Sequence, residues 1–133
     1  METDPVYYFS YVEAVALHIF LMREYGELRF GVADRTLVES ALARPQQAAA
    51  YENAELIRQA ATLCFGLIKN HPWFGGNKRT ATAITQAFLK KNKLIYHAHV
   101  GETLQMVLNV ESDLWKVDEI EVWLRARTHP FKK

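Results

Sequence analysis

Apolar positions recur at three- and four-residue spacing along much of the chain, the period of an amphipathic helix. Ser10 and Glu13 stand at capping-box spacing, at which each side chain can satisfy a backbone N–H of the other residue. Gly26 suits the left-handed position just after a helix. We therefore expect a first helix between Ser10 and Gly26. Its predicted apolar face consists of Val12, Val15, Ala16, Ile19 and Phe20.

A short second helix is expected after Asp34, whose carboxylate suits an N-cap position. Its apolar positions are Leu37, Val38, Ala41 and Leu42. Because a proline disfavours helical backbone in the residue before it, this helix should finish before Pro45. Gln46 to Tyr51 has neither helical nor strand periodicity, so we expect a loop or flap there.

The strongest helical pattern starts at Asn53 or a neighbour and ends near His71, just before Pro72. Apolar residues cover most of its circumference, which is typical of a central buried helix. These residues are Leu56, Ile57, Ala60, Ala61, Cys64, Phe65, Leu67 and Ile68.

Three further helices are expected over Lys78 to Lys91, Thr103 to Val110 and Asp118 to Arg127, with a short extended piece at Leu94 to Tyr96. The inward-facing residues of the first and last are Ala81, Ile84, Thr85, Phe88, Ile120, Trp123 and Leu124. The alternating pattern of half-buried strands is lacking and no repeat is found. The sequence therefore predicts an all-α fold with a single domain over residues 1–133.

Composition narrows the class of protein. Of 133 residues, 50% are apolar and 23% charged, the formal net charge is +1, and Cys64 is the one cysteine. A chain of this length can bury a core of ordinary size, while disorder and a disulfide scaffold are excluded. The near-neutral charge argues against a dedicated DNA-binding domain, so we expect no nucleic-acid partner.

Targeting and membrane signals are also lacking. The first residues are acidic, unlike the start of a secretory signal, and the apolar stretch from Tyr7 to Met22 is interrupted by Glu13 and His18. We expect a cytoplasmic protein without a membrane partner.

The charge is unevenly distributed. Residues 1–55 carry a net −5 and residues 102–133 a net −1, whereas residues 56–101 carry +7 and contain no acid. We interpret this acid-free stretch as the wall of an anion pocket.

The segment from His71 to Arg79, His-Pro-Trp-Phe-Gly-Gly-Asn-Lys-Arg, is the most informative in the chain. A helix beginning near Asn77 presents unpaired N–H groups and a partial positive charge, which favour phosphate. Gly75 and Gly76 let the backbone approach a ligand closely, and Lys78 and Arg79 add cationic donors. The imidazole of His71 suits a general base.

The same segment is also compatible with a plain turn and N-cap bearing two solvated cations. Cations in a first turn oppose the helix dipole, however, and a bound anion would offset that repulsion. Two cations at the unfavourable end of a helix therefore favour a functional anion site.

Several other residues have simpler structural interpretations. His18 is expected in the core, Cys64 as an inert buried thiol, and His129 in a frayed tail. His97 and His99 alternate like a metal pair, but no cysteine or carboxylate neighbour completes a zinc pattern. Arg58 and Lys69 are expected to be either solvated or part of the rim of the anion pocket.

At this segment the sequence resembles the Fic signature, His-Pro-Phe-x-Asp/Glu-Gly-Asn-Gly/Lys-Arg. Lys78, followed by Thr80 and Ala81, resembles the Doc (death-on-curing) toxin branch. Asp34-Arg35, Leu37 and the run from Glu39 to Gln47 resemble the upstream segment of Doc-like proteins. The likeness extends from about Tyr11 to Arg127.

The resemblance implies a compact six-helix Fic-like bundle with a short flap. It also implies a toxin of a toxin–antitoxin pair that transfers the terminal phosphate of ATP, or another nucleoside triphosphate, to a protein hydroxyl. The implied target is elongation factor Tu, whose modification blocks translation, and the implied partner is a Phd-like antitoxin.

The resemblance further assigns roles to residues. His71 would be the base, Asn77 and Arg79 would hold phosphate oxygens, and Lys78 would set the nucleotide orientation. The phosphate-binding set implied is Gly75, Gly76, Asn77, Lys78 and Arg79. Trp73 would anchor the loop in the core, and the segment from Arg44 to Glu55 would be the flap that aligns the target peptide by strand addition.

Trp73 replaces the usual Phe of the Fic pattern, and two further departures matter. Thr82 replaces a second Arg of many Fic proteins, as in the Doc branch. Gly75 replaces the acid that binds the metal, so no metal ligand is assigned. Mg²⁺ is then held by nucleotide phosphates and water, or catalysis is weak or lost. A catalytically impaired binding module and a Fic-type AMP transferase remain the alternatives.

Overall fold

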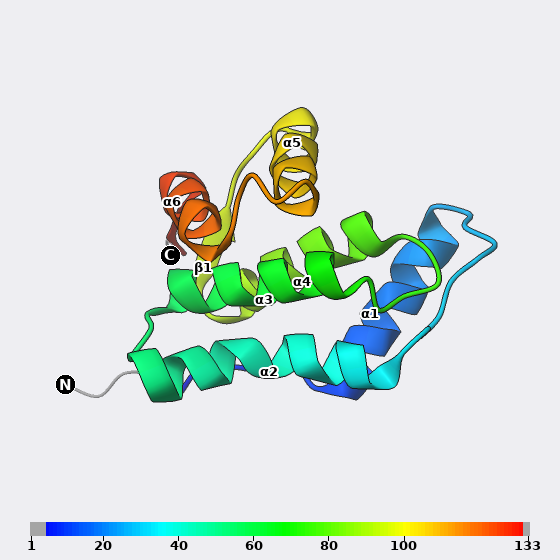
Figure 1. Cartoon of the computed structure of the whole chain (residues 1–133), viewed down its shortest axis with the longest axis horizontal. Helices are drawn as coiled ribbons and strands as arrows, with labels where there is room; N and C mark the ends of the chain where they lie inside the picture. The colour runs from blue at the N-terminus through cyan, green and yellow to red at the C-terminus, as the bar shows by residue number, and fades with distance from the viewer. Residues whose placement is uncertain (1–4, 132–133) are drawn as a thin grey trace.

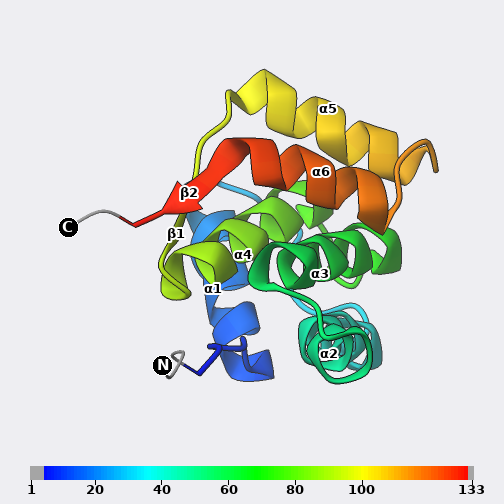
Figure 2. The same cartoon turned by 90° about the vertical axis from the view of Figure 1, so that its left-hand side faces the viewer.

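The computed structural model describes residues 5–131, and this part of the chain folds into six helices with a small two-stranded sheet at one edge (Figures 1 and 2). The all-α prediction is confirmed. The elements are α1 (Tyr11–Glu24), α2 (Arg35–Glu52), α3 (Leu56–Asn70), α4 (Asn77–Lys91), β1 (Leu94–Tyr96), α5 (Val100–Glu111), α6 (Val117–Arg127) and β2 (Thr128–Pro130).

Helix α3 is the centre of the fold, as its apolar circumference predicted. Helix α2 packs on one side of it, α5 and α6 on the other, and α4 lies alongside (Figures 1 and 2). Its fully or almost fully buried residues include Ala60, Ala61, Leu63, Cys64, Leu67 and Ile68. Burying each larger aliphatic side chain contributes about 1.5–3 kcal/mol, so this helix carries much of the core.

Both ends of α1 follow the sequence prediction. The Ser10 hydroxyl accepts from the Glu13 N–H at 3.1 Å, and the Glu13 carboxylate accepts from the Ser10 N–H at 2.9 Å. Gly26 follows with φ of +67°. The predicted apolar face was wrong in part, because Val12 and Phe20 are 74% and 59% exposed. The buried stripe is instead Ala14, His18 and Met22, which recur every four residues along one face of the helix.

Helix α2 confirms the Asp34 cap, whose carboxylate accepts from the Leu37 N–H at 3.2 Å. The predicted end before Pro45 was wrong, as was the loop or flap after it, because α2 continues through Pro45 to Glu52. A proline inside a helix removes one hydrogen bond. Here the following alanines favour helix and the long contact with α3 offsets the loss.

The Arg44 to Glu55 flap is therefore wrong as well: most of this segment is helix, and Asn53 is the left-handed C-cap of α2 with φ of +55°. Helix α3 begins two residues beyond Ala54, at Leu56. A helical segment has its backbone groups bonded internally and cannot pair with a peptide by strand addition.

The C-terminal elements agree with the predicted pattern except at the last one. The expected inward faces of α4 and α6 are buried. The extended piece at Leu94–Tyr96 forms β1, which pairs antiparallel with β2. The frayed tail predicted at His129 was wrong, because His129 lies in β2 opposite Ile95 and stacks on His97.

Among residues 5–131, no helix combines the length and the apolar character that crossing a bilayer requires.

Candidate phosphate-binding site

The loop between α3 and α4 turns through two left-handed residues. His71 caps the end of α3 with φ of +47°, and Gly76 precedes α4 with φ of +66°. A Cβ at Gly76 would lie 2.5 Å from the Met22 thioether. Glycine is thus required at position 76 for both its backbone conformation and its closeness to α1.

The first turn of α4 leaves backbone donors at this loop. Thr80 is the residue whose N–H bonds back to the Gly76 carbonyl, at 2.9 Å. The N–H groups of Asn77, Lys78 and Arg79 precede that bond, which is the arrangement that makes a helix N-terminus an anion site.

The Asn77 side chain closes the loop on itself. Its Oδ1 accepts from the Trp73 N–H at 3.0 Å, and its Nδ2 donates to the Trp73 carbonyl at 2.9 Å. Both ends of the amide are therefore engaged within the protein. A phosphate contact by Asn77 is left to its backbone N–H and to the second proton of Nδ2.

Trp73 anchors the loop in the core, as predicted. Its side chain is buried, and its indole stacks on the His18 imidazole with ring centroids 4.2 Å apart. His18 is fully buried, as expected, and its Nδ1 lies 2.8 Å from the Thr80 hydroxyl. Burial lowers the pKa of His18 to about 4, so its ring is neutral at pH 7.

An irregular segment, residues 27–33, lies beside the α3–α4 loop. Val32 forms an antiparallel bridge with Trp73, the Phe74 N–H donates to the Gly31 carbonyl at 2.9 Å, and the Ala33 N–H donates to the Pro72 carbonyl at 2.9 Å. Leu28 on this segment is 98% exposed. Sequence reasoning missed this feature, although Gly26 precedes it and Gly31 lies within it.

Glu111, at the end of α5, joins two of the predicted site residues. One oxygen of its carboxylate lies 3.3 Å from His71 Nε2, and the other lies 3.6 Å from Lys78 Nζ. The Glu111 side chain is three-quarters buried, with 24% exposed. Sequence reasoning missed Glu111 because it lies far beyond the loop in sequence and carries no local motif.

Arg79 has different neighbours. Its guanidinium lies 3.7 Å from the centre of the Tyr25 ring and 3.8 Å from a carboxylate oxygen of Glu27. The two adjacent cations of the loop are thus paired with acids from different parts of the chain, Glu27 after α1 and Glu111 in α5.

The position of the expected metal-binding acid is closed to a side chain. A Cβ on Gly75 would overlap the carbonyl oxygen of Arg29. Among residues 5–131, no group of three or more His, Cys, Asp or Glu side chains is placed to hold a metal ion. The residues present therefore do not fit a carboxylate-held Mg²⁺ at this loop.

Two cations of the acid-free stretch lie outside the site. Arg58 pairs with Asp118 and Glu121 of α6, and Lys69 pairs with Asp113 at 2.6 Å. Acids from the C-terminal part of the chain thus balance much of the positive stretch. Arg58 and Lys69 therefore do not belong to the predicted pocket wall, whereas Lys78 and Arg79 lie at the α3–α4 loop.

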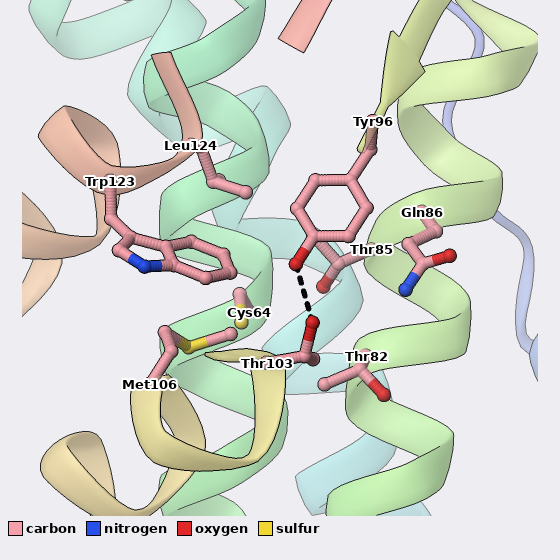
Figure 3. Close-up of a pocket in the computed structure, with 9 residues that line it drawn as sticks. All are labelled: Cys64, Thr82, Thr85, Gln86, Tyr96, Thr103, Met106, Trp123 and Leu124. Carbon is pink, nitrogen blue, oxygen red and sulfur yellow. Dashed lines mark hydrogen bonds between the residues drawn. The ribbon is translucent and has the colours of Figure 1, made fainter. Parts of the chain in front are cut away.

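A separate pocket lies between α3, α4, α5 and α6, with Tyr96 and Thr103 joined by a 2.7 Å hydrogen bond at its edge (Figure 3). Its volume of about 10 Å³ holds about one water and excludes a nucleotide. Cys64 lines this pocket, and burial raises the pKa of its thiol to about 12. Cys64 is therefore an inert buried thiol, as predicted.

Comparison with protein families gives one match: a model described as the Fic/DOC family fits residues 8–89. The matched region contains the α3–α4 loop and segment 27–33 but not α5, which carries Glu111. The comparison with curated proteins gives no match.

Proposed function

The chain belongs to the Fic/DOC family, a membership that indicates a transferase, and from this premise we propose that it is a Doc-like phosphotransferase. It transfers the terminal phosphate of ATP, or of another nucleoside triphosphate, to a protein hydroxyl. The oxygen of that hydroxyl forms the new bond to phosphorus, the bond from phosphorus to the bridging oxygen breaks, and a nucleoside diphosphate leaves.

One observation carries the proposal: His71 Nε2 and Lys78 Nζ contact the two oxygens of the Glu111 carboxylate, at 3.3 and 3.6 Å. The proposed base and the proposed phosphate-binding cation are thereby held close together by one carboxylate. In the proposed reaction Lys78 and the N–H groups of the first turn of α4 hold phosphate oxygens, and His71 takes the proton of the attacking hydroxyl.

The charge of the phosphates is balanced by the protein itself in this proposal. Lys78, Arg79 and the N-terminus of α4 supply positive charge at the loop. We assign no step to a protein-held metal ion, because Gly75 offers no ligand and a side chain at this position would meet the Arg29 carbonyl.

The Doc branch is proposed on two residues of α4. Lys78 stands where adenylyl-transferring Fic proteins have glycine, and Thr82 stands where many of them have a second arginine. The Thr82 hydroxyl donates to carbonyl oxygens of its own helix, Lys78 and Arg79, and adds no positive charge.

We propose that segment 27–33, rather than the helical Arg44 to Glu55, receives the target protein. Its exposed Leu28 and the antiparallel bridge from Val32 to Trp73 place this segment next to the loop that carries His71, and a backbone that already pairs at Val32 is the kind that strand addition uses. Elongation factor Tu is the candidate target and a Phd-like antitoxin the candidate partner, both from the resemblance.

Label transfer tests the proposal. The purified chain is incubated with elongation factor Tu and ATP labelled at the γ- or the α-phosphate, with His71→Ala as the control. We expect γ-label on the target with the parent chain, no α-label, and neither label with His71→Ala. α-Label on the target would show that the chain is a nucleotidyl transferase and not a kinase.

A second candidate, a catalytically impaired binding module, is favoured by Gly75, which stands in place of the acid expected for metal binding. This candidate predicts that the chain binds nucleotide in calorimetry but transfers neither label.

A further inference from the structure

His18 lies where four parts of the candidate site meet. Its helix, α1, passes beneath the α3–α4 loop, its ring stacks on Trp73, and its two nitrogens reach Thr80 of α4 and Gly31 of segment 27–33. The nitrogen contacts are 2.8 and 3.0 Å long, and the side chain is fully buried. The reaction proposed above does not use this residue.

The hydrogen-bond directions at His18 follow from its partners. The Gly31 N–H is a donor, so Nε2 must accept and carries no proton. A neutral imidazole then has its proton on Nδ1, which donates to the Thr80 hydroxyl. Each edge of the ring thus has one fixed partner, and the two edges cannot exchange roles.

The Thr80 edge controls the start of α4. Thr80 makes the first backbone bond of α4, to Gly76, and Lys78 and Arg79 stand directly before it. Fixing the Thr80 side chain therefore fixes the turn whose N–H groups and cations face the anion site.

The Gly31 edge controls segment 27–33. The Gly31 carbonyl accepts from the Phe74 N–H on one side, while its N–H donates to His18 on the other. Gly31 has φ of +109°, a conformation that few other residues adopt. The His18 contact holds this unusual backbone against the loop.

We propose that His18 is a positioning residue whose two ring nitrogens fix the two halves of the site separately. Nδ1, through Thr80, sets the nucleotide half, and Nε2, through Gly31, sets the half that receives the target protein. The assignment of these halves rests on the proposed function, whereas the two contacts are independent of it.

Two substitutions separate the edges of the ring. The amide of His18→Asn reaches about as far as Nδ1 and retains a donor toward Thr80, but leaves the Gly31 N–H without its partner. The longer His18→Gln places its amide oxygen near the Nε2 position and retains the Gly31 bond, but loses Thr80. A third variant, Thr80→Val, keeps the shape of residue 80 and removes its hydroxyl.

Two measurements are made on each variant: hydrogen exchange of the Gly31 amide by NMR, and calorimetric titration with ADP. For His18→Asn we expect Gly31 exchange to accelerate about tenfold and ADP affinity to stay within about twofold. For His18→Gln and Thr80→Val we expect the reverse, an ADP affinity about tenfold lower and Gly31 protection close to that of the parent.

Far-UV circular dichroism and thermal unfolding accompany each variant. If His18→Asn and His18→Gln lose Gly31 protection and ADP affinity together, or keep both, His18 is only a core residue and the proposal is overturned. Thr80→Val decides the nucleotide edge even where a substitution at residue 18 prevents folding, because an unchanged ADP affinity in that variant contradicts the assignment.

The outcome is distinguishable from failure of the proposed function. A chain that binds ADP but transfers no label to any hydroxyl removes the phosphotransferase, while the opposite responses of the two His18 variants still establish the two-edged role. A parent chain that does not bind ADP removes both the proposed function and the nucleotide half of this proposal.

Discussion

The carboxylate of Glu111 and the imidazole of His71 are joined by a 3.3 Å contact, and the other oxygen of the same carboxylate faces Lys78 at 3.6 Å. Because Glu111 is an anion beside a cation expected to bind phosphate, an incoming nucleotide must compete with it. This contact between the end of α5 and the start of α4 is the basis of the first prediction.

Replacing Glu111 by Gln should raise the affinity for ADP about two- to fivefold. The substitution removes one negative charge near Lys78, and an ion pair of this length and exposure contributes up to about 1 kcal/mol. Calorimetric titration at two salt concentrations measures the effect, which should shrink as ionic strength rises.

Asp113→Asn is the matched control for Glu111→Gln. It removes the same charge close by in the chain, but from a carboxylate that pairs with Lys69. An equal gain in both variants would mean that only net charge matters. A loss of ADP affinity in Glu111→Gln would mean that the carboxylate helps to hold the nucleotide.

Gly75→Ala should lower the free energy of unfolding by about 1–3 kcal/mol, because its Cβ would overlap the Arg29 carbonyl. Gly75→Asp should destabilise the chain similarly and should not make ADP binding depend on Mg²⁺. Urea unfolding measures stability, with Gly101→Ala as the control, since a Cβ there meets nothing within 4 Å. A gain of Mg²⁺-dependent binding in Gly75→Asp would contradict the steric argument.

Asn77→Ala should lower the free energy of unfolding by about 2 kcal/mol. The substitution leaves the Trp73 N–H and carbonyl without their partners in a half-buried loop. Asn109→Ala, which removes an exposed contact with Gln105, should cost less than about 0.5 kcal/mol. Similar stabilities of the two variants would show that the Asn77 contacts do not hold the loop.

Stability should fall between about pH 6.5 and pH 4 through the titration of His18. Burial lowers the pKa of His18 in the folded chain to about 4 from an ordinary value of 6.5. The unfolded chain therefore binds a proton that the folded chain excludes, which weakens folding as the pH falls across this range. The full difference between these two pKa values corresponds to about 3 kcal/mol in the free energy of unfolding.

Urea unfolding across this range, compared between the parent and His18→Gln, isolates the contribution of His18, because the other titrating groups are shared. The parent should lose more stability than the variant on acidification. Equal losses in the two proteins would contradict the assignment of a neutral buried imidazole.

Local features were the predictable ones. The caps at Ser10 and Asp34, the end of α3 at His71 and the start of α4 depend on residues a few positions apart, so the sequence contains what determines them. The α3–α4 loop belongs to this class, because its two glycines and cations are adjacent in the chain.

Features set by tertiary contacts were not predictable in the same way. The continuation of α2 through Pro45 depends on packing against α3, and the buried stripe of α1 depends on which neighbours it meets. Glu111 approaches His71 only after α5 folds back over the core. The apolar pattern of α5 gives its helix but not its place beside the loop.

The central claim is that His71 and the start of α4 transfer a terminal phosphate to a protein hydroxyl. Intact-mass spectrometry of elongation factor Tu, after incubation with ATP and either the parent chain or His71→Ala, tests it most directly. We expect a gain of one phosphate with the parent chain and no change with His71→Ala. A gain of a nucleoside monophosphate, or a phosphate gain that survives His71→Ala, would contradict it.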